Sequence, residues 1–424
     1  MMDLSDARAL LRDLFRAAIR AADPAEAMSR ALDRDPLPRP DDGGRLILVA
    51  FGKAAPAMLR AAMERAKGPV TALAVTHHEN DGSVPEGAEL HRAGHPDPDE
   101  AGAAAAQRVC DLLAGAGAAD RVVALISGGG SALLPAPAGD LTLADKVETN
   151  RLLLRSGLEI EQINLVRQQL SRLKGGGMLR LAAPAPVTAY ILSDVVSDDL
   201  RAIASGPTAE PLGSPEEARD GLAKAGIWDE LPEAVRHHLE TLRPDSDPVP
   251  EAHNILIGSN RQSVAAMGLA VPEGLESFQR EEPLTGDVVD AAEIIFRAAE
   301  TVERGEAPVL LLFGGETTVK LRGEGTGGRN QELALRVALD GEERLGRNWA
   351  FLSGGTDGRD GPTDAAGGIV DAGTFERIDA SGENAWALLD DNDSHAALQL
   401  SGDLLVTGAT GTNVADVQAL ILWP

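Results

Sequence analysis

Short apolar runs of strand length alternate with helix-length segments through the first half of this 424-residue chain. The runs are RLILVAF (45–51), VTALAV (70–75), RVVALIS (121–127) and VTAYILS (187–193). Strands that are apolar throughout are buried on both faces, which is typical of parallel sheets covered by helices. We therefore predict an α/β fold for this half, with a doubly wound, Rossmann-like parallel sheet.

Two helices are predicted between the third and the fourth of these runs. Thr142 and Asp145 have the spacing of a capping box for a helix that ends at Gly157. A second helix is predicted to start at about Glu159 and to run into Lys174, where three consecutive glycines stop it.

The sequence changes character around residues 206–250, which are rich in proline, aspartate and glutamate. This composition is typical of a surface excursion and an interdomain link. HNILIGSN (253–260) then begins a second set of apolar runs, and a chain of this length exceeds what one hydrophobic core serves. We predict an N-terminal domain over residues 1–240 and a second α/β domain over residues 241–424.

Composition and charge exclude several classes of function. The net charge of −27 argues against a nucleic-acid partner, because no basic surface is present to displace counterions. The single cysteine, Cys110, excludes an intramolecular disulfide framework, and the eight histidines lack metal-ligand spacing. No apolar stretch reaches the roughly 18 residues of a membrane span, and the start of the chain lacks a signal-peptide pattern. We expect a soluble, cytoplasmic protein without a membrane partner.

Five glycine-rich turns follow apolar runs and carry charged or hydroxyl side chains. They are FGKAA (51–55), SGGGS (127–131), GGETT (314–318), GEGTGGRNQE (323–332) and SGGTDGRDGPTDAA (353–366). A strand that ends in glycines brings bare backbone N–H groups to an edge of the sheet, where they can surround an anion. This pattern predicts an enzyme that handles phosphate.

The first two turns contain the strongest candidates for ligand contact. Lys53 follows Gly52 at the expected start of a helix, so its ammonium adds to amide donors and to the positive end of the helix dipole. A lysine at an ordinary surface turn remains the alternative. In the second turn, Ser127 and Ser131 flank the glycines Gly128, Gly129 and Gly130, whose lack of Cβ permits close backbone approach to a ligand.

Gly323, Gly325 and Gly328 formally match the dinucleotide-binding fingerprint, but their context differs from it. The fingerprint belongs early in a strand-turn-helix unit, with an acidic residue ~20 positions later. Here the glycines follow the polar run TTVKLR, and Arg329 and Asn330 come at the expected helix start. The helix dipole disfavours an arginine there unless an anion lies nearby, which indicates phosphate contact by Arg329.

Carboxylates at strand ends and in glycine turns are candidates for magnesium ligands and catalytic bases. These candidates are Asp194, Glu316, Asp357, Asp360 and Asp364. In a chain with 66 acidic residues, a turn-forming or solvated carboxylate is the alternative for each of them.

Polar residues outside these turns leave alternatives open as well. Asn260 opens a helix after a strand and could contact a nucleotide, and a glycine-threonine turn with Thr410 and Thr412 comes near the end. Such residues are also common local caps. His95, between two prolines of GHPDPD, could orient a substrate or only support a rigid loop.

Nine ordered segments of the chain resemble the class II glycerate kinases, the glycerate 2-kinase family. The segments are FGKAAPAM, GHPDPD, SGGGSALL, INLVRQQLSRLKGG, LSDVVSDDLRAIASGPT, FGGETTV, GTGGRNQELAL, SGGTDGRDGPTDAAG and TGATGTNVAD. They span nearly the whole chain, and residues 308–424 resemble the MOFRL domain of that family. Two positions depart from the usual motifs, with Ser197 in place of glycine and Ala409 in place of proline. Both residues are small, so the departures cast little doubt on activity.

The resemblance implies a two-domain α/β enzyme with its active site in the interdomain cleft. The implied reaction transfers the γ-phosphoryl of ATP to the 2-hydroxyl of D-glycerate with Mg²⁺. The family's catalytic lysine and arginine correspond to Lys53 and Arg329. Asp194, Glu316 and Asp357 lie in motifs that the family places around the site, with Asp194 or Glu316 as the base and the other carboxylates as metal ligands.

Phosphoryl transfer relies on positioning and on positive charge around the transferring group, which Lys53, Arg329 and the metal would supply. The carboxylate of glycerate needs a pocket of its own, for which we expect Ser127–Ser131.

Two other functions stay open from the sequence. Members of the family have been labelled hydroxypyruvate reductases, which would consume NADH or NADPH. A regulator without catalysis would bind ATP or a sugar acid without turnover. The sequence also leaves the oligomeric state open, a homodimer included.

Overall fold

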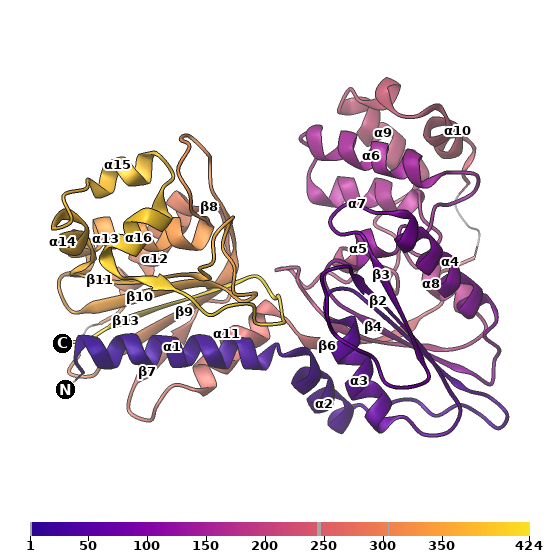
Figure 1. Cartoon of the computed structure of the whole chain (residues 1–424), viewed down its shortest axis with the longest axis horizontal. Helices are drawn as coiled ribbons and strands as arrows, with labels where there is room; N and C mark the ends of the chain where they lie inside the picture. Colours follow the sequence, from indigo (N-terminus) through magenta and orange to yellow (C-terminus); the bar gives the residue numbers. More distant parts are fainter. Residues whose placement is uncertain (1, 244–246, 304) are drawn as a thin grey trace. The chain divides into compact units, whose positions relative to one another are not determined.

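The chain folds into two compact units in the computed structural model, which describes residues 2–243, 247–303 and 305–424. We call them the N-terminal unit (Pro24–Ile257) and the C-terminal unit (Met1–Asp23 with Gly258–Pro424). Each unit contains one β-sheet with helices packed against it (Figure 1). No described helix is long and apolar enough to cross a lipid bilayer.

The N-terminal unit contains a six-stranded sheet. Its strands are β1 (Leu46–Phe51), β2 (Val70–His77), β3 (Ala88–Ala93), β4 (Arg121–Ile126), β5 (Val187–Leu192) and β6 (Ala252–Gly258). Its helices are α2 (Pro24–Arg34), α3 (Ala55–Arg65), α4 (Glu100–Ala114), α5 (Gly130–Leu133), α6 (Leu143–Arg155), α7 (Ile160–Gln169), α8 (Gly177–Ala182), α9 (Pro215–Lys224) and α10 (Glu233–Thr241), with short 3-10 turns η1 (Ile203–Ser205) and η2 (Trp228–Glu230).

The strand order of this sheet is β3-β2-β1-β4-β5-β6, which is the order of the dinucleotide-binding fold. The pairs β1/β2, β1/β4, β2/β3 and β4/β5 are parallel, and Leu46 is opposite Val70 on one side and Arg121 on the other. All six residues of β1 are buried, so both faces of the sheet centre are covered. The predicted doubly wound α/β fold is therefore confirmed.

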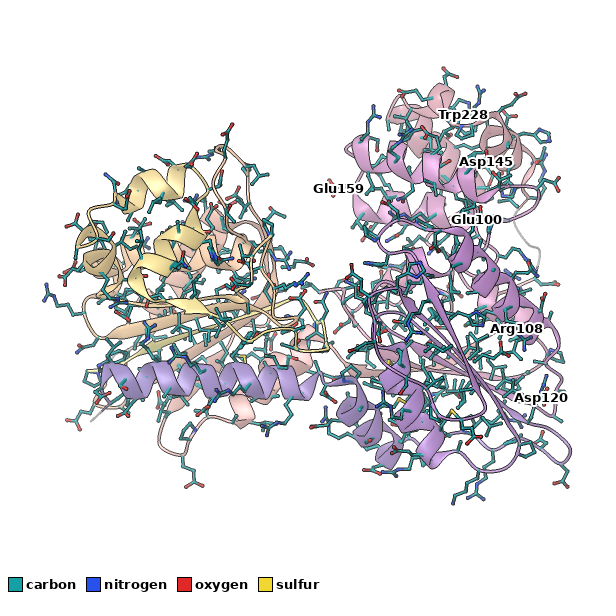
Figure 2. All side chains as sticks on the ribbon, viewed as in Figure 1. Glu100, Arg108, Asp120, Asp145, Glu159 and Trp228 are labelled. Atoms are coloured by element: carbon teal, nitrogen blue, oxygen red, sulfur yellow. The ribbon has the colours of Figure 1, made fainter. Side chains whose placement is uncertain are left out.

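Four helices of the N-terminal unit share a core of their own beside the sheet (Figure 1). Leu153 of α6, Leu222 of α9 and Leu239 of α10 are buried in this core. The predicted capping box at the start of α6 is confirmed, since Thr142 and Asp145 bond each other's backbone N–H (Asp145 is labelled in Figure 2).

The segment 206–250, predicted as a surface excursion and an interdomain link, forms packed helices in its central part. The segment contains α9 and α10, which join the core shared with α6 and α7. Single leucines at helical spacing among many prolines and acids were too sparse a signal for the sequence pattern to show two packed helices. Residues 244–246 of the expected link lie outside the described residues.

The C-terminal unit contains a seven-stranded mixed sheet. Its strands are β7 (Glu276–Gln279), β8 (Leu284–Asp287), β9 (Val309–Thr318), β10 (Trp349–Gly355), β11 (Gly367–Asp371), β12 (Leu404–Leu405) and β13 (Asp416–Leu422). Its helices are α1 (Leu4–Ala21), α11 (Asn260–Leu269), α12 (Val288–Thr301), α13 (Arg329–Leu345), α14 (Thr374–Asp379), α15 (Ala385–Asp390) and α16 (Ser394–Ser401).

The order of this sheet is β12-β11-β10-β13-β9-β7, with β8 also paired to β9. The pairs among β9 to β13 are antiparallel, whereas β7 and β8 run parallel to β9. One face of the sheet packs against α1 and α11, and the other packs against α12 and α13 (Figure 1).

The boundary predicted between residues 240 and 241 differs from the division that the structure shows. Residues Met1–Asp23 belong to the C-terminal unit, where Leu11, Leu14 and Phe15 of α1 are buried against its sheet. Strand β6, predicted to begin the second domain, is instead the sixth strand of the first sheet. An amphipathic stripe shows that a helix packs against apolar surface but does not show which sheet supplies that surface.

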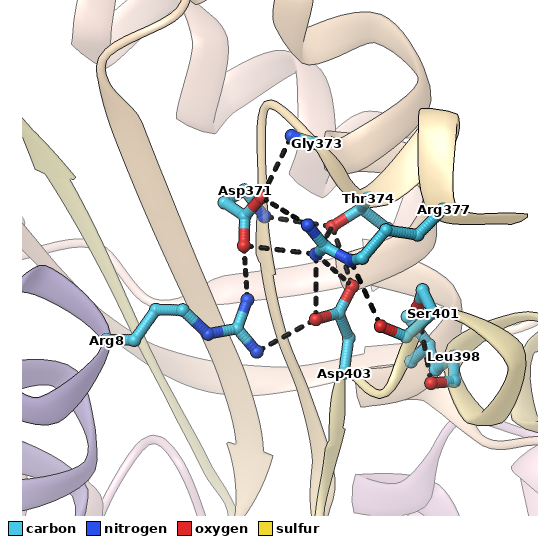
Figure 3. A network of polar contacts seen from close by, with 8 residues as sticks. All are labelled: Arg8, Asp371, Gly373, Thr374, Arg377, Leu398, Ser401 and Asp403. Atoms are coloured by element: carbon cyan, nitrogen blue, oxygen red, sulfur yellow. Dashed lines mark hydrogen bonds and ion pairs between the residues drawn. The ribbon is translucent and has the colours of Figure 1, made fainter. Parts of the chain in front are cut away.

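A network of arginines and buried aspartates connects α1 to the rest of the C-terminal unit (Figure 3). Arg8 of α1 pairs with Asp371 and with Asp403, the latter at 2.8 Å. Arg377 of α14 also bonds both carboxylates, at 3.0 and 2.8 Å. Burial opposes ionisation of Asp371, but the hydrogen bond and charge of Arg377 outweigh burial and lower its pKa. The network therefore holds the buried carboxylate of Asp371 in its charged form.

We expect Arg8→Ala to lower the free energy of unfolding of the C-terminal unit by about 2 kcal/mol. The substitution leaves two buried carboxylates with one cation instead of two, which is destabilising in a dry environment. Urea unfolding followed by circular dichroism measures the change. Arg16→Ala is the matched control, because Arg16 lies on the same helix and its side chain is 70% exposed. Equal stability of the two variants would contradict the role of Arg8.

Candidate active site

The first two glycine turns meet at the topological switch point of the parallel sheet. The chain continues from β1 to β2 and β3 on one side, and β4 begins the other side, so the switch point lies between β1 and β4. Gly52 and Lys53 follow β1, and Ser127–Ser131 follow β4. Ligands of open parallel sheets bind outside the carboxyl ends of the strands at this point.

Hydrogen bonds tie the two turns together. The backbone N–H of Lys53 donates to the carbonyl of Gly128 at 2.9 Å, and that of Ala54 donates to Oγ of Ser127 at 3.1 Å. Gly52 has a φ of +119°, and a Cβ there would lie 2.2 Å from Oγ of Ser127. Glycine is required at this position because the turns approach so closely.

These bonds correct part of the expectation for Lys53. The backbone amides at the start of α3 are used inside the protein, so they do not add to its side chain as expected. The Lys53 side chain itself is exposed and forms no ion pair in the part of the chain that the structure describes. Beside it, the backbone amides of Gly128, Gly129, Gly130 and Ser131 donate to no acceptor among the described residues. This edge therefore offers one exposed cation and four amide donors.

Asp194, directly after β5, lies against the second turn. A Cβ on Gly128 would lie 2.3 Å from Oδ2 of Asp194, so the carboxylate touches the backbone of this turn. Burial raises the pKa of Asp194, and the charge of Lys53 partly opposes the shift. A carboxylate with a raised pKa beside a cation is suited to accept a proton from a hydroxyl group.

Two histidines complete this edge, and sequence reasoning singled out only one of them. His95 lies after β3, within 3.1 Å of where a Cβ on Gly129 would be, and Cγ of Lys53 lies within 3.3 Å of the same point. His77 ends β2, with its ring centroid 6.5 Å from that of His95. Burial and then the Lys53 charge lower the pKa of both histidines, so both are neutral at pH 7. We call Lys53, His77, His95, Ser127–Ser131 and Asp194 the lysine edge.

A second cluster lies in the C-terminal unit around Arg329, the first residue of α13. Its guanidinium bonds both oxygens of Asp416 at 2.6 and 3.0 Å and one oxygen of Glu316 at 3.0 Å. Burial disfavours its charge, but the hydrogen bond and charge of Asp416 outweigh burial and raise the pKa of Arg329. We call Arg329, Glu316 and Asp416 the arginine cluster.

Asp416 was missed from the sequence, although it is fully buried beside the arginine that was predicted. Its position as the last acid before a short apolar run at the chain end was the only available signal. The anion expected near Arg329 is therefore a carboxylate of the protein itself.

The start of α13 is capped by a carboxylate of the protein. Both oxygens of Asp360 accept backbone N–H groups, from Asn330 at 3.1 Å and from Gln331 at 2.8 Å. Burial raises the pKa of Asp360, with those hydrogen bonds opposing the shift. A phosphate at this helix start would have to replace the Asp360 carboxylate.

The glycine turn before α13 is explained by packing. Gly323 and Gly325 lie against Asp391, where a Cβ would approach its atoms to within 2.1 and 2.6 Å. Backbone amides of residues 322–326 donate to the side chains or carbonyls of residues 391–393. The resemblance to a dinucleotide fingerprint therefore arises from a tight contact between two loops.

Three predicted ligand-binding residues have structural bonds in the C-terminal unit. The amide of Asn260, 5% exposed, donates to the carbonyls of Val414 and Asp416 at 2.9 and 2.7 Å. Asn330 is 1% exposed and accepts from Ser353 at 2.6 Å. Asp357 accepts the backbone N–H of Arg359 at 3.0 Å, as a turn-forming aspartate does. Contact of these three residues with a nucleotide remains a prediction.

The two predicted metal ligands belong to different units, Asp194 to the N-terminal unit and Glu316 to the C-terminal unit. No group of three or more His, Cys, Asp or Glu side chains suited to a metal was found among the described residues. Mg²⁺ in phosphoryl-transfer enzymes often takes only one or two carboxylates, with nucleotide phosphates and water as its other ligands. The carboxylates of Asp194 and Glu316 supply oxygen atoms of the kind that such an ion takes from protein.

Comparisons with known proteins identify the family. A family described as a domain of unknown function, DUF4147, matches residues 10–240, and the MOFRL family matches residues 309–416. A D-glycerate 2-kinase of Thermotoga maritima is 39% identical, covering 98% of this chain and 99% of that one. The chain belongs to the glycerate 2-kinase family.

A solved structure and a relative with a different name also match the chain. The crystal structure of a glycerate kinase from Thermotoga maritima matches with a TM-score of 0.88 at 35% identity, covering 99% of this chain and 100% of that one. A protein of Agrobacterium vitis, provisionally named a hydroxypyruvate reductase, is 38% identical over 98% of this chain and 94% of its own length. Members of the glycerate 2-kinase family thus carry both names.

Proposed function

We propose that this chain is a glycerate 2-kinase, which transfers the γ-phosphoryl of ATP to the 2-hydroxyl of D-glycerate with Mg²⁺. The lysine edge carries the proposal, because it combines an unpaired ammonium, amide donors and a carboxylate of raised pKa at a sheet switch point. The names of the relatives support it.

In the proposed reaction, the lysine edge binds the transferring phosphoryl group. The amides of Gly128–Ser131 and the ammonium of Lys53 surround its oxygens, and Asp194 accepts the proton that leaves the glycerate hydroxyl. By resemblance to the family, Arg329 would supply a further cation to the phosphoryl group. Asp194 or Glu316 would hold Mg²⁺ together with the nucleotide phosphates, and the ion would supply positive charge at the leaving oxygen.

The test is a coupled assay for ADP. We expect ADP only when D-glycerate, ATP and a magnesium salt are all present, and phosphorus NMR of the product should show 2-phosphoglycerate. 3-Phosphoglycerate as the product would contradict the assigned hydroxyl. ATP binding without ADP release would indicate the non-catalytic regulator instead.

The reductase is the second candidate, because one relative carries that name. It predicts consumption of NADH or NADPH when hydroxypyruvate is added. The residues that resemble a dinucleotide fingerprint do not favour it, since their amides bond residues 391–393. Oxidation of NADH or NADPH without ADP formation would replace the kinase assignment.

We also propose a cytoplasmic location, as expected from the sequence. Light scattering of the purified protein distinguishes a homodimer from a monomer, both of which the sequence leaves open.

A further inference from the structure

A cavity of about 220 Å³ opens in the N-terminal unit beside the lysine edge. Gly129 and Ser131 of the second glycine turn form part of its wall, together with His95. The remaining wall comes from α6, from α7 with the segment after it, and from the apolar residues Pro96, Pro98, Ala132 and Pro135. We call this space the basic cavity, because Lys146, Arg167 and Lys174 line it.

The three cations converge on the basic cavity without an acidic partner. None of the residues that line it, all of them within the described range 95–174, is aspartate or glutamate. Such a group is unusual in a chain of net charge −27, and buried cations normally have a carboxylate partner. The arrangement implies that the partner is an anionic ligand.

Each cation is positioned by neutral groups that leave donors available. Nζ of Lys146 donates to the carbonyl of Leu170 at 2.8 Å, and Nζ of Lys174 donates to the carbonyl of Ser131 at 2.8 Å. Both lysines are more than nine-tenths buried. An ammonium has three donors, so two remain on each lysine when it is protonated.

Arg167 is held in a similar way by two asparagines. Nε and Nη2 bond Oδ1 of Asn150, and Nη1 lies 3.4 Å from Oδ1 of Asn164. These bonds use three of its five N–H donors, which leaves two for a ligand. Two N–H donors on one guanidinium suit a carboxylate, whose two oxygens accept side by side.

The segment of this wall that follows α7 differs from the sequence prediction. The helix predicted to run from about Glu159 into Lys174 ends at Gln169, and residues 170–174 continue without helix. Ala204 and Ser205, which follow in η1 and lie against the second glycine turn, have φ values of +50° and +62°. Strained backbone of this kind is typical of functional sites.

The size and position of the basic cavity restrict its occupant. A volume of about 220 Å³ is below the ~300 Å³ at which pockets begin to hold drug-sized ligands, so a nucleotide does not fit but a small organic acid does. Gly129 lies both in the cavity wall and against Lys53. An acid of three carbons bound here can therefore present its hydroxyl group to the lysine edge.

We propose that the basic cavity binds the carboxylate of the substrate hydroxy acid through Lys146, Arg167 and Lys174, an inference that rests on the proposed glycerate 2-kinase function. The cavity replaces Ser127–Ser131 as the main carboxylate pocket and leaves the amides of that turn for the phosphoryl group. The enzyme would thus select hydroxy acids over uncharged polyols.

Lys146→Met tests this inference, because methionine keeps an unbranched chain and removes the charge. We expect KM for D-glycerate to rise at least about 30-fold while KM for ATP stays within twofold. The preference for D-glycerate over glyceramide, its uncharged analogue, should fall by a similar factor, which a purely structural role would not produce. Lys67→Met, at an exposed lysine, is the control and should match the original enzyme.

Calorimetry without ATP separates this inference from the kinase assignment. D-Glycerate should bind the original protein and the Lys67→Met variant, and binding should be lost in Lys146→Met with an unchanged melting temperature. Binding with that pattern but without ADP formation would support the assignment of the cavity and contradict the assignment of kinase activity. ADP formation by Lys146→Met with an unchanged KM for D-glycerate would overturn the cavity assignment. Displacement of D-glycerate by inorganic phosphate but not by lactate would overturn it as well. If Lys146→Met is unstable, Arg167→Lys gives the same comparison with the charge retained and the paired donors lost, so a rise in KM of about tenfold is expected.

The pH dependence of binding provides a further check. Burial, and then the charge of Arg167, lower the pKa of Lys146 to about 7. Burial, and then the charges of Lys146 and Arg167, lower the pKa of Lys174 well below its usual value. The other ionisable groups facing the cavity are Arg167 and His95. Because the bound carboxylate needs protonated lysines, Kd for D-glycerate should rise as pH increases from 7 to 9, by up to tenfold per unit. A flat profile over this range would contradict the proposal.

Discussion

Lys53→Ala should lower kcat for ADP formation at least about 10³-fold, which corresponds to roughly 4 kcal/mol of transition-state stabilisation. Cations that surround a transferring phosphoryl group have effects of this size, because the protein contributes to this reaction mainly through charge and position. The side chain is exposed and forms no ion pair in the described part of the chain, so its removal should not disturb the fold. Steady-state rates with saturating ATP and D-glycerate measure the effect.

Lys67→Ala is the matched control for this experiment. Lys67 is an exposed lysine of the same unit and lies after α3, at the other end of the helix that Lys53 precedes. We expect unchanged kcat in the control and equal melting temperatures in both variants. If the Lys53→Ala enzyme retains more than a tenth of the original kcat, the lysine edge is not the site of phosphoryl transfer.

Arg329→Ala should lower both activity and stability, for separate reasons. Activity falls because a cation is lost from the transferring group, and we expect about 10³-fold in kcat. Stability falls because Asp416, which is fully buried, loses the guanidinium that bonds both its oxygens. Breaking such a pair leaves an uncompensated buried charge. Since the Arg329 side chain is 35% exposed, we expect a loss of about 2 kcal/mol in the free energy of unfolding.

The double variant Arg329→Ala with Asp416→Asn distinguishes the two roles. Asparagine removes the unpaired charge, so unfolding in urea should return to within about 1 kcal/mol of the original protein. The kcat defect should persist, because asparagine does not restore the cation. If activity recovers together with stability, Arg329 acts only as the structural partner of Asp416, and its assignment to the phosphoryl group is wrong.

The site residues of the first sheet were the most predictable part of the molecule. Uniformly apolar runs are typical of central strands, and the carboxyl ends of parallel strands meet at one edge, where Lys53, Ser127 and Asp194 follow their strands. The structure places all three there. The capping box at Thr142 was equally readable, because it depends on contacts between residues three apart.

The C-terminal unit was less predictable, because apolar runs that alternate with helical segments occur in both parallel and mixed sheets. The glycines from 323 to 328 resembled a ligand loop, yet their spacing reflects a close approach to Asp391 that no local pattern records. Asp416 and Asp360 were buried through contacts with residues 87 and 30 positions away. Sequence spacing carries no information about such partners.

The sequence by itself determined the central strands of the first sheet, the glycine turns at their ends and the membership of the family, since these depend on local periodicity and on ordered motifs. Only the tertiary structure decided that α1 packs in the C-terminal unit, that Asp416 neutralises Arg329, and that Lys146, Arg167 and Lys174 face one cavity. The physical reason is the distance along the sequence between the residues that interact. Burial and charge pairing are properties of surfaces assembled from distant segments, and the chain specifies those surfaces only through packing of the whole unit.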